Sequence, residues 1–177
     1  MQIIISGDIG SGKGTVSKML AEYFKYPRVS TGDLFREMAK ERNMSLIELL
    51  QLADEDRKIH QDLDDKVLDI LKEKNNLILD ARLGAYLAPN AFKVYLKVDE
   101  VVGARRILDR DRYSSIEQAV EQNKKRQEIA RQTFIKMYNF DFQNLRNYNI
   151  IIDTSYKQEG DVVMEIIDNF TSYKLGL

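Results

Sequence analysis

The chain contains no cysteine, a single histidine (His60) and only two prolines. Without cysteine there is no disulfide, no thiolate nucleophile and no zinc–sulfur site, and one histidine excludes a metal site built from several imidazoles. No apolar run approaches the roughly 20 residues of a membrane-spanning helix. The amino-terminal letters MQIIISGD carry no charged leader, so we expect no signal peptide and a cytoplasmic location.

The chain also lacks an excess of charge of either sign. The 27 basic and 28 acidic residues give a formal net charge of −1, which provides no overall attraction for nucleic acid or for an anionic membrane. We therefore expect neither as a partner. A length of 177 residues with 44% hydrophobic residues favours one domain over residues 1–177, and we expect it to act as a monomer.

Short apolar runs alternate with helical patterns along the chain. The runs QIIIS (2–6), RVS (28–30), LILD (77–80), FKVYLKV (92–98) and NIIID (149–153) are typical of buried parallel strands. We predict an α/β fold with a doubly wound parallel sheet of about five strands and helices on both faces. Two serine–glutamate pairs have the spacing of a helix-capping box: Ser45 with Glu48, and Ser114 with Glu117.

The stretch GDIGSGKGT follows the first apolar run and nearly matches the phosphate-binding pattern G-x-x-x-x-G-K-[ST]. Its glycines allow positive φ and close backbone approach, so that several N–H groups converge on phosphate oxygens at the start of a helix. Lys13 supplies a cation for the β- and γ-phosphates. We predict a P-loop NTPase fold in which ATP is bound by Gly7, Asp8, Ile9, Gly10, Ser11, Gly12, Lys13, Gly14 and Thr15.

The usual hydroxyl position of this loop holds Gly14, and the hydroxyl comes one residue later, at Thr15. Mg²⁺ would then be held mainly by phosphate oxygens and water. Asp80, at the end of LILD, is the expected carboxylate at the same edge of the sheet, acting through water. The sequence offers no reason for an acid, Asp8, beside a polyphosphate site.

Three segments together resemble one enzyme family. The ending GSGKGT is the form found in nucleoside monophosphate kinases. VSTGDLFRE (29–37) resembles the acceptor-binding segment of adenylate kinases and archaeal-type cytidylate kinases, and ILDARL (78–83) is similar to the Asp/Glu-Gly-Arg segment of cytidylate kinases. With MSLIELLQLADED and YNFDFQNLRNYNIIIDTS, the sequence is most similar to the archaeal-type cytidylate kinases, over almost the whole chain.

The resemblance implies direct transfer of the γ-phosphoryl group of ATP to CMP or dCMP, with Mg²⁺. It implies a helical acceptor-binding flap over residues 45–74 and a short lid over residues 105–126. The acceptor-binding residues would be Asp33, Arg36, Asp80 and Arg82. The catalytic residues would be Lys13, Arg106, Arg110 and Arg126, with Thr15 and Asp80 at the metal.

Four positions depart from the family pattern. Ala130 and Thr133 stand where an acid and an arginine are expected after Arg126, Ala81 replaces a glycine, and His60 replaces an acid. The base of the acceptor therefore stays open, and a carboxylate among Asp62, Asp64 and Asp65 is a candidate partner for a cytosine amino group. An enzyme acting on AMP or another small acceptor, and a non-catalytic nucleotide-binding switch, are the alternatives.

Overall fold

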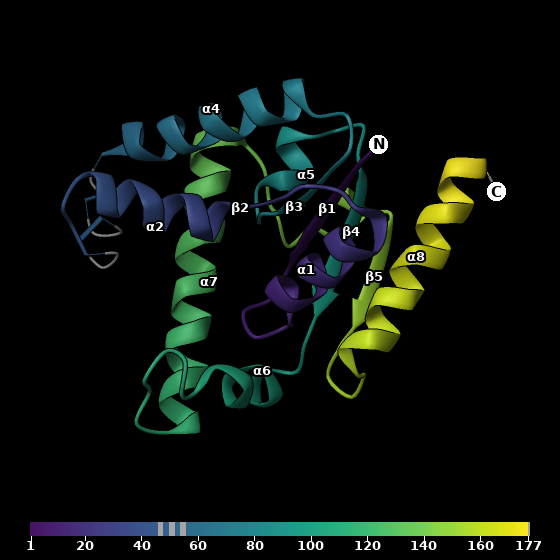
Figure 1. Ribbon diagram of the computed structural model, residues 1–177. Coiled ribbons are helices and arrows are strands. Elements are labelled where there is room, and N and C mark those ends of the chain that lie inside the picture. Colours follow the sequence, from purple (N-terminus) through teal and green to yellow (C-terminus); the bar gives the residue numbers. More distant parts are fainter. Residues whose placement is uncertain (46–47, 50–51, 54–55, 177) are drawn as a thin grey trace.

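The computed structural model describes residues 1–45, 48–49, 52–53 and 56–176. Five strands form one parallel sheet in the order β2-β3-β1-β4-β5 (Figure 1). Because β2 and β3 lie on one side of the central β1, and β4 and β5 lie on the other, the sheet is doubly wound, which confirms the predicted fold. The strands are β1 (Gln2–Gly7), β2 (Arg28–Ser30), β3 (Leu77–Asp80), β4 (Phe92–Lys97) and β5 (Ile150–Asp153).

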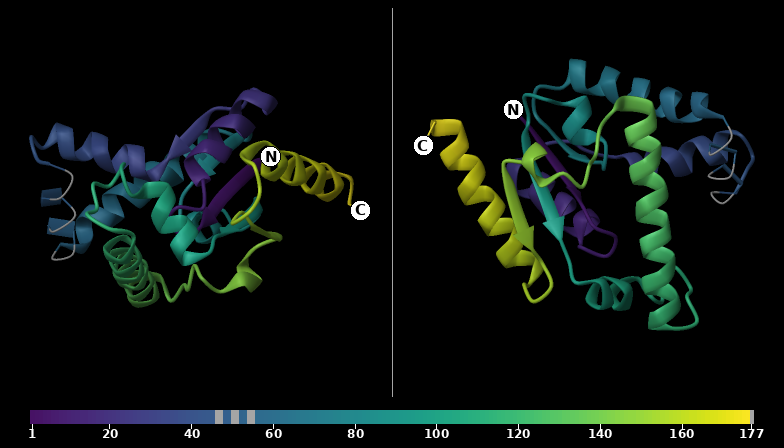
Figure 2. Two further views of the ribbon diagram at one scale, coloured as in Figure 1. Left: turned by 90° about the horizontal axis from the view of Figure 1, so that it is seen from below. Right: turned by 180° about the vertical axis from the view of Figure 1, so that it is seen from behind.

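Helices cover both faces of the sheet (Figure 2). Ile3 and Ile5 of β1 pack with one group of helices, α1 and α8, whereas Ile4 faces α4, α5 and α7 on the other side. This alternation follows from the two-residue period of a strand. The helices are α1 (Lys13–Phe24), α2 (Thr31–Glu41), α4 (Arg57–Glu73), α5 (Gly84–Leu87), α6 (Glu100–Ile107), α7 (Ile116–Tyr138) and α8 (Glu159–Leu175).

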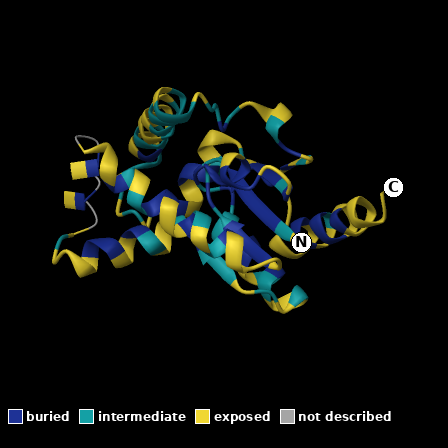
Figure 3. Ribbon diagram, turned by 90° about the horizontal axis from the view of Figure 1, so that it is seen from above, coloured by how far each residue is buried: buried dark blue, intermediate teal, exposed yellow. Residues whose placement is uncertain are grey.

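Helices α2 and α4 lie side by side and project from the sheet on the side opposite α8 (Figure 1). They share a separate small core, in which Phe35 and Met38 of α2 meet Ile59 and Leu63 of α4. Figure 3 shows how the buried residues follow the sheet and the inner helix faces, while the outer faces are exposed. The segment of residues 45–74, predicted as a flap, therefore shares its core with α2, and its residues 46–47, 50–51 and 54–55 lie outside the described residues.

Of the two predicted capping boxes, one is confirmed and one is displaced. Glu48 accepts a hydrogen bond from the Ser45 N–H at 2.6 Å, and the Glu48 N–H donates to Ser45 Oγ at 3.2 Å. The prediction for Ser114 was wrong by one residue, because Ser115 caps α7 by accepting from the Gln118 N–H at 3.2 Å. Among the described residues, no helix is long and apolar enough to cross a lipid bilayer.

Candidate active site

The phosphate loop connects the carboxyl end of β1 to the first turn of α1. Gly7, Gly10 and Gly12 have φ values of 144°, 81° and 87°, which side chains other than glycine rarely adopt. Gly14 instead belongs to the first turn of α1. The free N–H groups of that turn and the positive end of the helix dipole therefore meet at the loop, as anion binding requires.

Gly10 and Gly7 are also needed for packing. A Cβ atom on Gly10 would lie 2.3 Å from the carbonyl oxygen of Gly103 in α6, and one on Gly7 would lie 2.2 Å from the carbonyl oxygen of Leu96 in β4. Real Cβ atoms do not approach backbone this closely. The loop is thus pressed against α6 and β4, which holds its curvature.

Lys13 lies inside this loop. Its ammonium group donates hydrogen bonds to the carbonyl oxygens of Gly7 and Asp8. Burial lowers the pKa of Lys13 to about 8, and the nearby positive charge of Arg82 adds to the effect. A phosphate group beside the ammonium would favour its charged form and reverse this shift, so the position is suited to an anion.

Asp8 does not line the cavity beside the loop but connects the loop to neighbouring elements. Its carboxylate accepts hydrogen bonds from the Tyr95 hydroxyl at 2.7 Å, the Gln127 side-chain amide at 2.9 Å and the Val98 N–H at 3.1 Å. Gln127, on α7, also accepts from the Ile9 N–H at 3.3 Å. Burial and the neighbouring Asp8 raise the pKa of Tyr95, which keeps it a donor. The acid therefore ties the loop to β4 and α7.

We expect Tyr95→Phe to raise the KM for ATP by about three- to tenfold and to lower the free energy of unfolding by about 1–2 kcal/mol, since Asp8 loses one of its donors. The KM of the acceptor should not change. Steady-state kinetics and urea unfolding measure both effects. Tyr148→Phe is the matched control. The centroid of the Tyr148 ring lies 4.9 Å from that of the Tyr95 ring, but the Tyr148 hydroxyl forms hydrogen bonds with Phe142 and Ser6 rather than with Asp8. An equal change in the KM for ATP in both variants would contradict the role of Asp8.

A cavity of about 540 Å³ opens beside the loop. Of the predicted ATP-binding residues, Gly7, Asp8 and Ser11 do not line it, while the others do. All four predicted acceptor-binding residues and both predicted metal-binding residues line it. So do Lys13, Arg110 and Arg126 of the predicted catalytic residues, and Arg106 does not.

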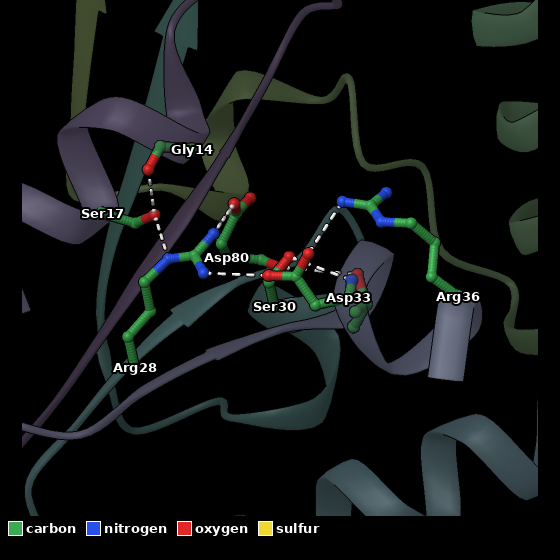
Figure 4. Close-up of polar contacts among 8 residues, drawn as sticks. Gly14, Ser17, Arg28, Ser30, Asp33, Arg36 and Asp80 are labelled. Atoms are coloured by element: carbon green, nitrogen blue, oxygen red, sulfur yellow. Dashed lines mark hydrogen bonds and ion pairs between the residues drawn. The ribbon is translucent and has the colours of Figure 1, made fainter. Parts of the chain in front are cut away.

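Arg28, which the sequence analysis missed, organises one wall of this cavity (Figure 4). Its guanidinium donates to Ser17 Oγ at 2.7 Å and forms ion pairs at 3.0 Å with both Asp33 and Asp80. The other oxygen of Asp33 pairs with Arg36 at 2.7 Å. One signal was available in the sequence: a charged residue opens an otherwise apolar strand segment. Asp33 therefore forms ion pairs with both Arg36 and Arg28. Arg28 in turn holds the carboxylates of Asp33 and Asp80 in place relative to α1, through its hydrogen bond to Ser17.

Arg82 follows β3 and faces the same cavity. Its guanidinium lies over the Phe142 ring, 5.9 Å from the centroid. Burial lowers the pKa of Arg82 to about 10, and repulsion from Arg126 contributes. An arginine at this pKa is still fully charged at neutral pH, so the cavity holds cations that an acceptor phosphate would neutralise.

The arginines of the predicted lid fall into two groups. Arg110 and Arg126 reach the cavity and both pair with Asp111, at 2.7 and 2.9 Å. Arg106 donates instead to the carbonyl oxygens of Thr154 at 2.7 Å and Gly10 at 3.4 Å. The structure thus places Arg106 between the phosphate loop and the segment after β5.

Magnesium would have few protein ligands here. No group of three or more histidine or acidic residues suited to a metal occurs in the described ranges. Thr15 and Asp80 both line the cavity, and a Cβ atom on Gly14 would lie 3.9 Å from Asp80 Oδ2, so Asp80 is near the loop. This donor set fits an ion held by phosphate oxygens and water, as Mg²⁺ prefers.

The part of the cavity formed by α2, α4 and α7 has three apolar side chains, Phe35, Leu63 and Phe134, beside polar ones that include Asp33, Arg36, His60, Asp64 and Arg126. Asp64 accepts a short hydrogen bond from the Tyr138 hydroxyl. Burial raises the pKa of Asp64 to about 6, and the charge of Asp65 acts in the same direction, against the lowering effect of Tyr138. Asp62 does not line the cavity and pairs with Arg42 at 3.4 Å.

Residues 2–156 match the family model described as the cytidylate kinase-like family. The chain belongs to this family. Two relatives in it are cytidylate kinases. That of Sulfolobus acidocaldarius is 33% identical over 172 residues, covering 94% of each chain. That of Haloarcula marismortui is 38% identical over 157 residues, covering 88% of this chain and 81% of the relative.

A solved structure shows the same fold at low sequence identity. Shikimate kinase from Aquifex aeolicus superposes with a TM-score of 0.65 at 20% identity, covering the whole of both chains. The cytidylate kinase-like family member described here therefore has the fold of small P-loop kinases.

Proposed function

We propose that the protein transfers the γ-phosphoryl group of ATP to CMP or dCMP. The observation that carries this proposal is one cavity lined by both the phosphate loop with Lys13 and a second set of phosphate-binding cations, Arg36 and Arg82. A site for two phosphate-bearing molecules is what a nucleotide-to-nucleotide kinase needs. The identity of the acceptor base, cytosine, is inferred from the relatives, which are cytidylate kinases.

In the proposed reaction an oxygen of the acceptor phosphate attacks the γ-phosphorus of ATP, and the bond from that phosphorus to the β,γ-bridging oxygen breaks, which releases ADP. No enzyme nucleophile is needed, because positioning and charge neutralisation supply the catalysis. Arg36 and Arg82 hold the acceptor in line. Lys13, Arg110 and Arg126 neutralise the charge on the transferred group, and Arg106 supports the loop.

Mg²⁺, when bound with ATP, would neutralise phosphate charge, with Asp80 and Thr15 reaching it directly or through water. Arg28 orients Asp80 for this task through their ion pair at 3.0 Å. We propose that the flap of residues 45–74 closes over the acceptor and the lid of residues 105–126 over ATP, which would exclude water. A cytoplasmic location and a monomeric state stay predictions of the sequence.

The experiment that tests the proposal is a coupled assay of ADP release with ATP, Mg²⁺ and each of CMP, dCMP, UMP, AMP and GMP. We expect CMP and dCMP to give the highest kcat/KM. Turnover stimulated by AMP alone would instead support the adenylate kinase-like alternative. ATP hydrolysis that no monophosphate stimulates would support a nucleotide-binding switch.

We expect Arg36→Ala to raise the KM for CMP by about 10- to 100-fold, because a charge-assisted contact to phosphate contributes about 1.5–3 kcal/mol. The KM for ATP should stay within twofold. Arg42→Ala, just after the same helix, is the control, since Arg42 pairs with Asp62 and does not line the cavity. Unchanged acceptor kinetics in Arg36→Ala would remove Arg36 from the acceptor site.

A further inference from the structure

Besides the charged residues that would hold the acceptor phosphate, the acceptor side of the cavity has three apolar side chains and a carboxyl group on α4. Phe35 of α2, Leu63 of α4 and Phe134 of α7 supply aromatic and aliphatic surface, and Asp64 supplies the carboxyl. A flat nucleobase fits such walls, while its polar edge needs a partner in the plane of the ring. Asp64 is the only acid on α4 that lines this cavity, within the residues that the structure describes.

Asp64 is unusual for a carboxyl group because it is only 9% exposed. A buried carboxyl group costs stability unless it is hydrogen-bonded. Tyr138 of α7 donates to Oδ2, and an ionised carboxylate has acceptor capacity for further donors. The phenol therefore orients the carboxyl group without using all of its acceptor sites.

One face of α7 links the core to Asp64. Ala130, Phe134 and Tyr138 follow one another at intervals of four residues and share a helix face. Ala130 packs against the core of Tyr95 and Phe142, Phe134 lines the cavity, and Tyr138 donates to the carboxylate of Asp64. This face of α7 therefore holds Asp64 in place through Tyr138.

We propose that Asp64, positioned by Tyr138, selects cytosine over uracil in the acceptor nucleotide; this inference rests on the proposed function. Cytosine presents an amino group, a donor, where uracil presents a carbonyl oxygen. An ionised carboxylate accepts from the amino group and repels the carbonyl oxygen. An asparagine at this position could donate to uracil as well as accept from cytosine. Adenine also carries an amino group, so Asp64 does not by itself exclude AMP.

The test compares kcat/KM for CMP and for UMP at pH 8 in the wild type and three variants. Asp64→Asn should lower the CMP-to-UMP ratio at least tenfold, since discrimination by a hydrogen-bonding site is lost. Tyr138→Phe should lower the ratio about threefold, through the KM for CMP. Asp62→Asn, the same change on the same helix outside the cavity, should leave the ratio unchanged. The KM for ATP should stay within twofold in all three variants.

The outcomes separate this inference from the proposed function. A wild type that phosphorylates neither CMP nor dCMP would overturn the proposed function, whatever Asp64 does. A wild type that prefers CMP, together with an Asp64→Asn variant whose ratio stays within twofold, would overturn only the inference. If circular dichroism shows that Asp64→Asn does not fold, an unchanged ratio in Tyr138→Phe overturns it.

Discussion

Replacing Lys13 by methionine should lower kcat for phosphoryl transfer by about 10³-fold or more, because the variant loses the cation that neutralises the transferred group. Methionine keeps much of the length of the side chain, so the loop should keep its course. The measurement is the coupled assay at saturating ATP and CMP. Lys72→Met, on the exposed face of α4, is the control and should retain wild-type kcat.

The same substitution makes a prediction about stability. Burial lowers the pKa of Lys13 to about 8 from 10.5, so between these values the unfolded chain binds the proton and the folded chain releases it. Wild-type stability at this site should therefore rise from pH 8 to pH 10.5 relative to the Lys13→Met variant. Urea unfolding of both proteins at several pH values measures the difference.

For the catalytic prediction, a kcat of the Lys13→Met variant within tenfold of wild type would contradict the assignment of Lys13.

Replacing Gly10 by alanine should lower the free energy of unfolding by about 3 kcal/mol or more. Two costs combine: a φ of 81° strains any residue with a Cβ atom, and that atom would meet the carbonyl oxygen of Gly103 at 2.3 Å. Relieving the contact must separate the phosphate loop from α6. We therefore also expect a large loss of ATP binding.

Gly12→Ala is the matched control for this prediction. Gly12 has a similar φ of 87°, but nothing lies within 4 Å of its Cβ position, so only the backbone strain of about 1–2 kcal/mol remains. Urea unfolding with linear extrapolation compares the two variants. Equal losses of stability would show that the contact with Gly103 does not constrain the loop.

Much of the site was predictable because its signals are local in sequence. The phosphate loop, Asp33, Arg36, Asp80 and Arg82 lie within short motifs at the ends of apolar strands, and parallel strands bring their carboxyl ends to one edge of the sheet. The cavity indeed gathers Arg36, Asp80 and Arg82 beside Lys13. Their roles in catalysis stay predictions until the variants are measured.

Other features were missed because their partners are distant in sequence. Asp8 meets Gln127 across 119 residues, Asp64 meets Tyr138 across 74, and Arg28 meets Asp80 across 52. No local pattern identifies such pairs. The choice between Ser114 and Ser115 as the cap of α7 was similarly open, since both serines suit a helix start.

The sequence by itself determined the doubly wound sheet and a glycine-rich loop with the phosphate-binding pattern, because hydrophobic period and glycine spacing are properties of neighbouring residues. Only the tertiary structure decided what those residues do together. It directs the carboxylate of Asp8 to the Tyr95 hydroxyl, places Arg106 outside the cavity lining, and brings Asp64 to the Tyr138 hydroxyl. Side-chain partners of this kind depend on how helices pack across the sheet, which the order of residues along one element does not specify.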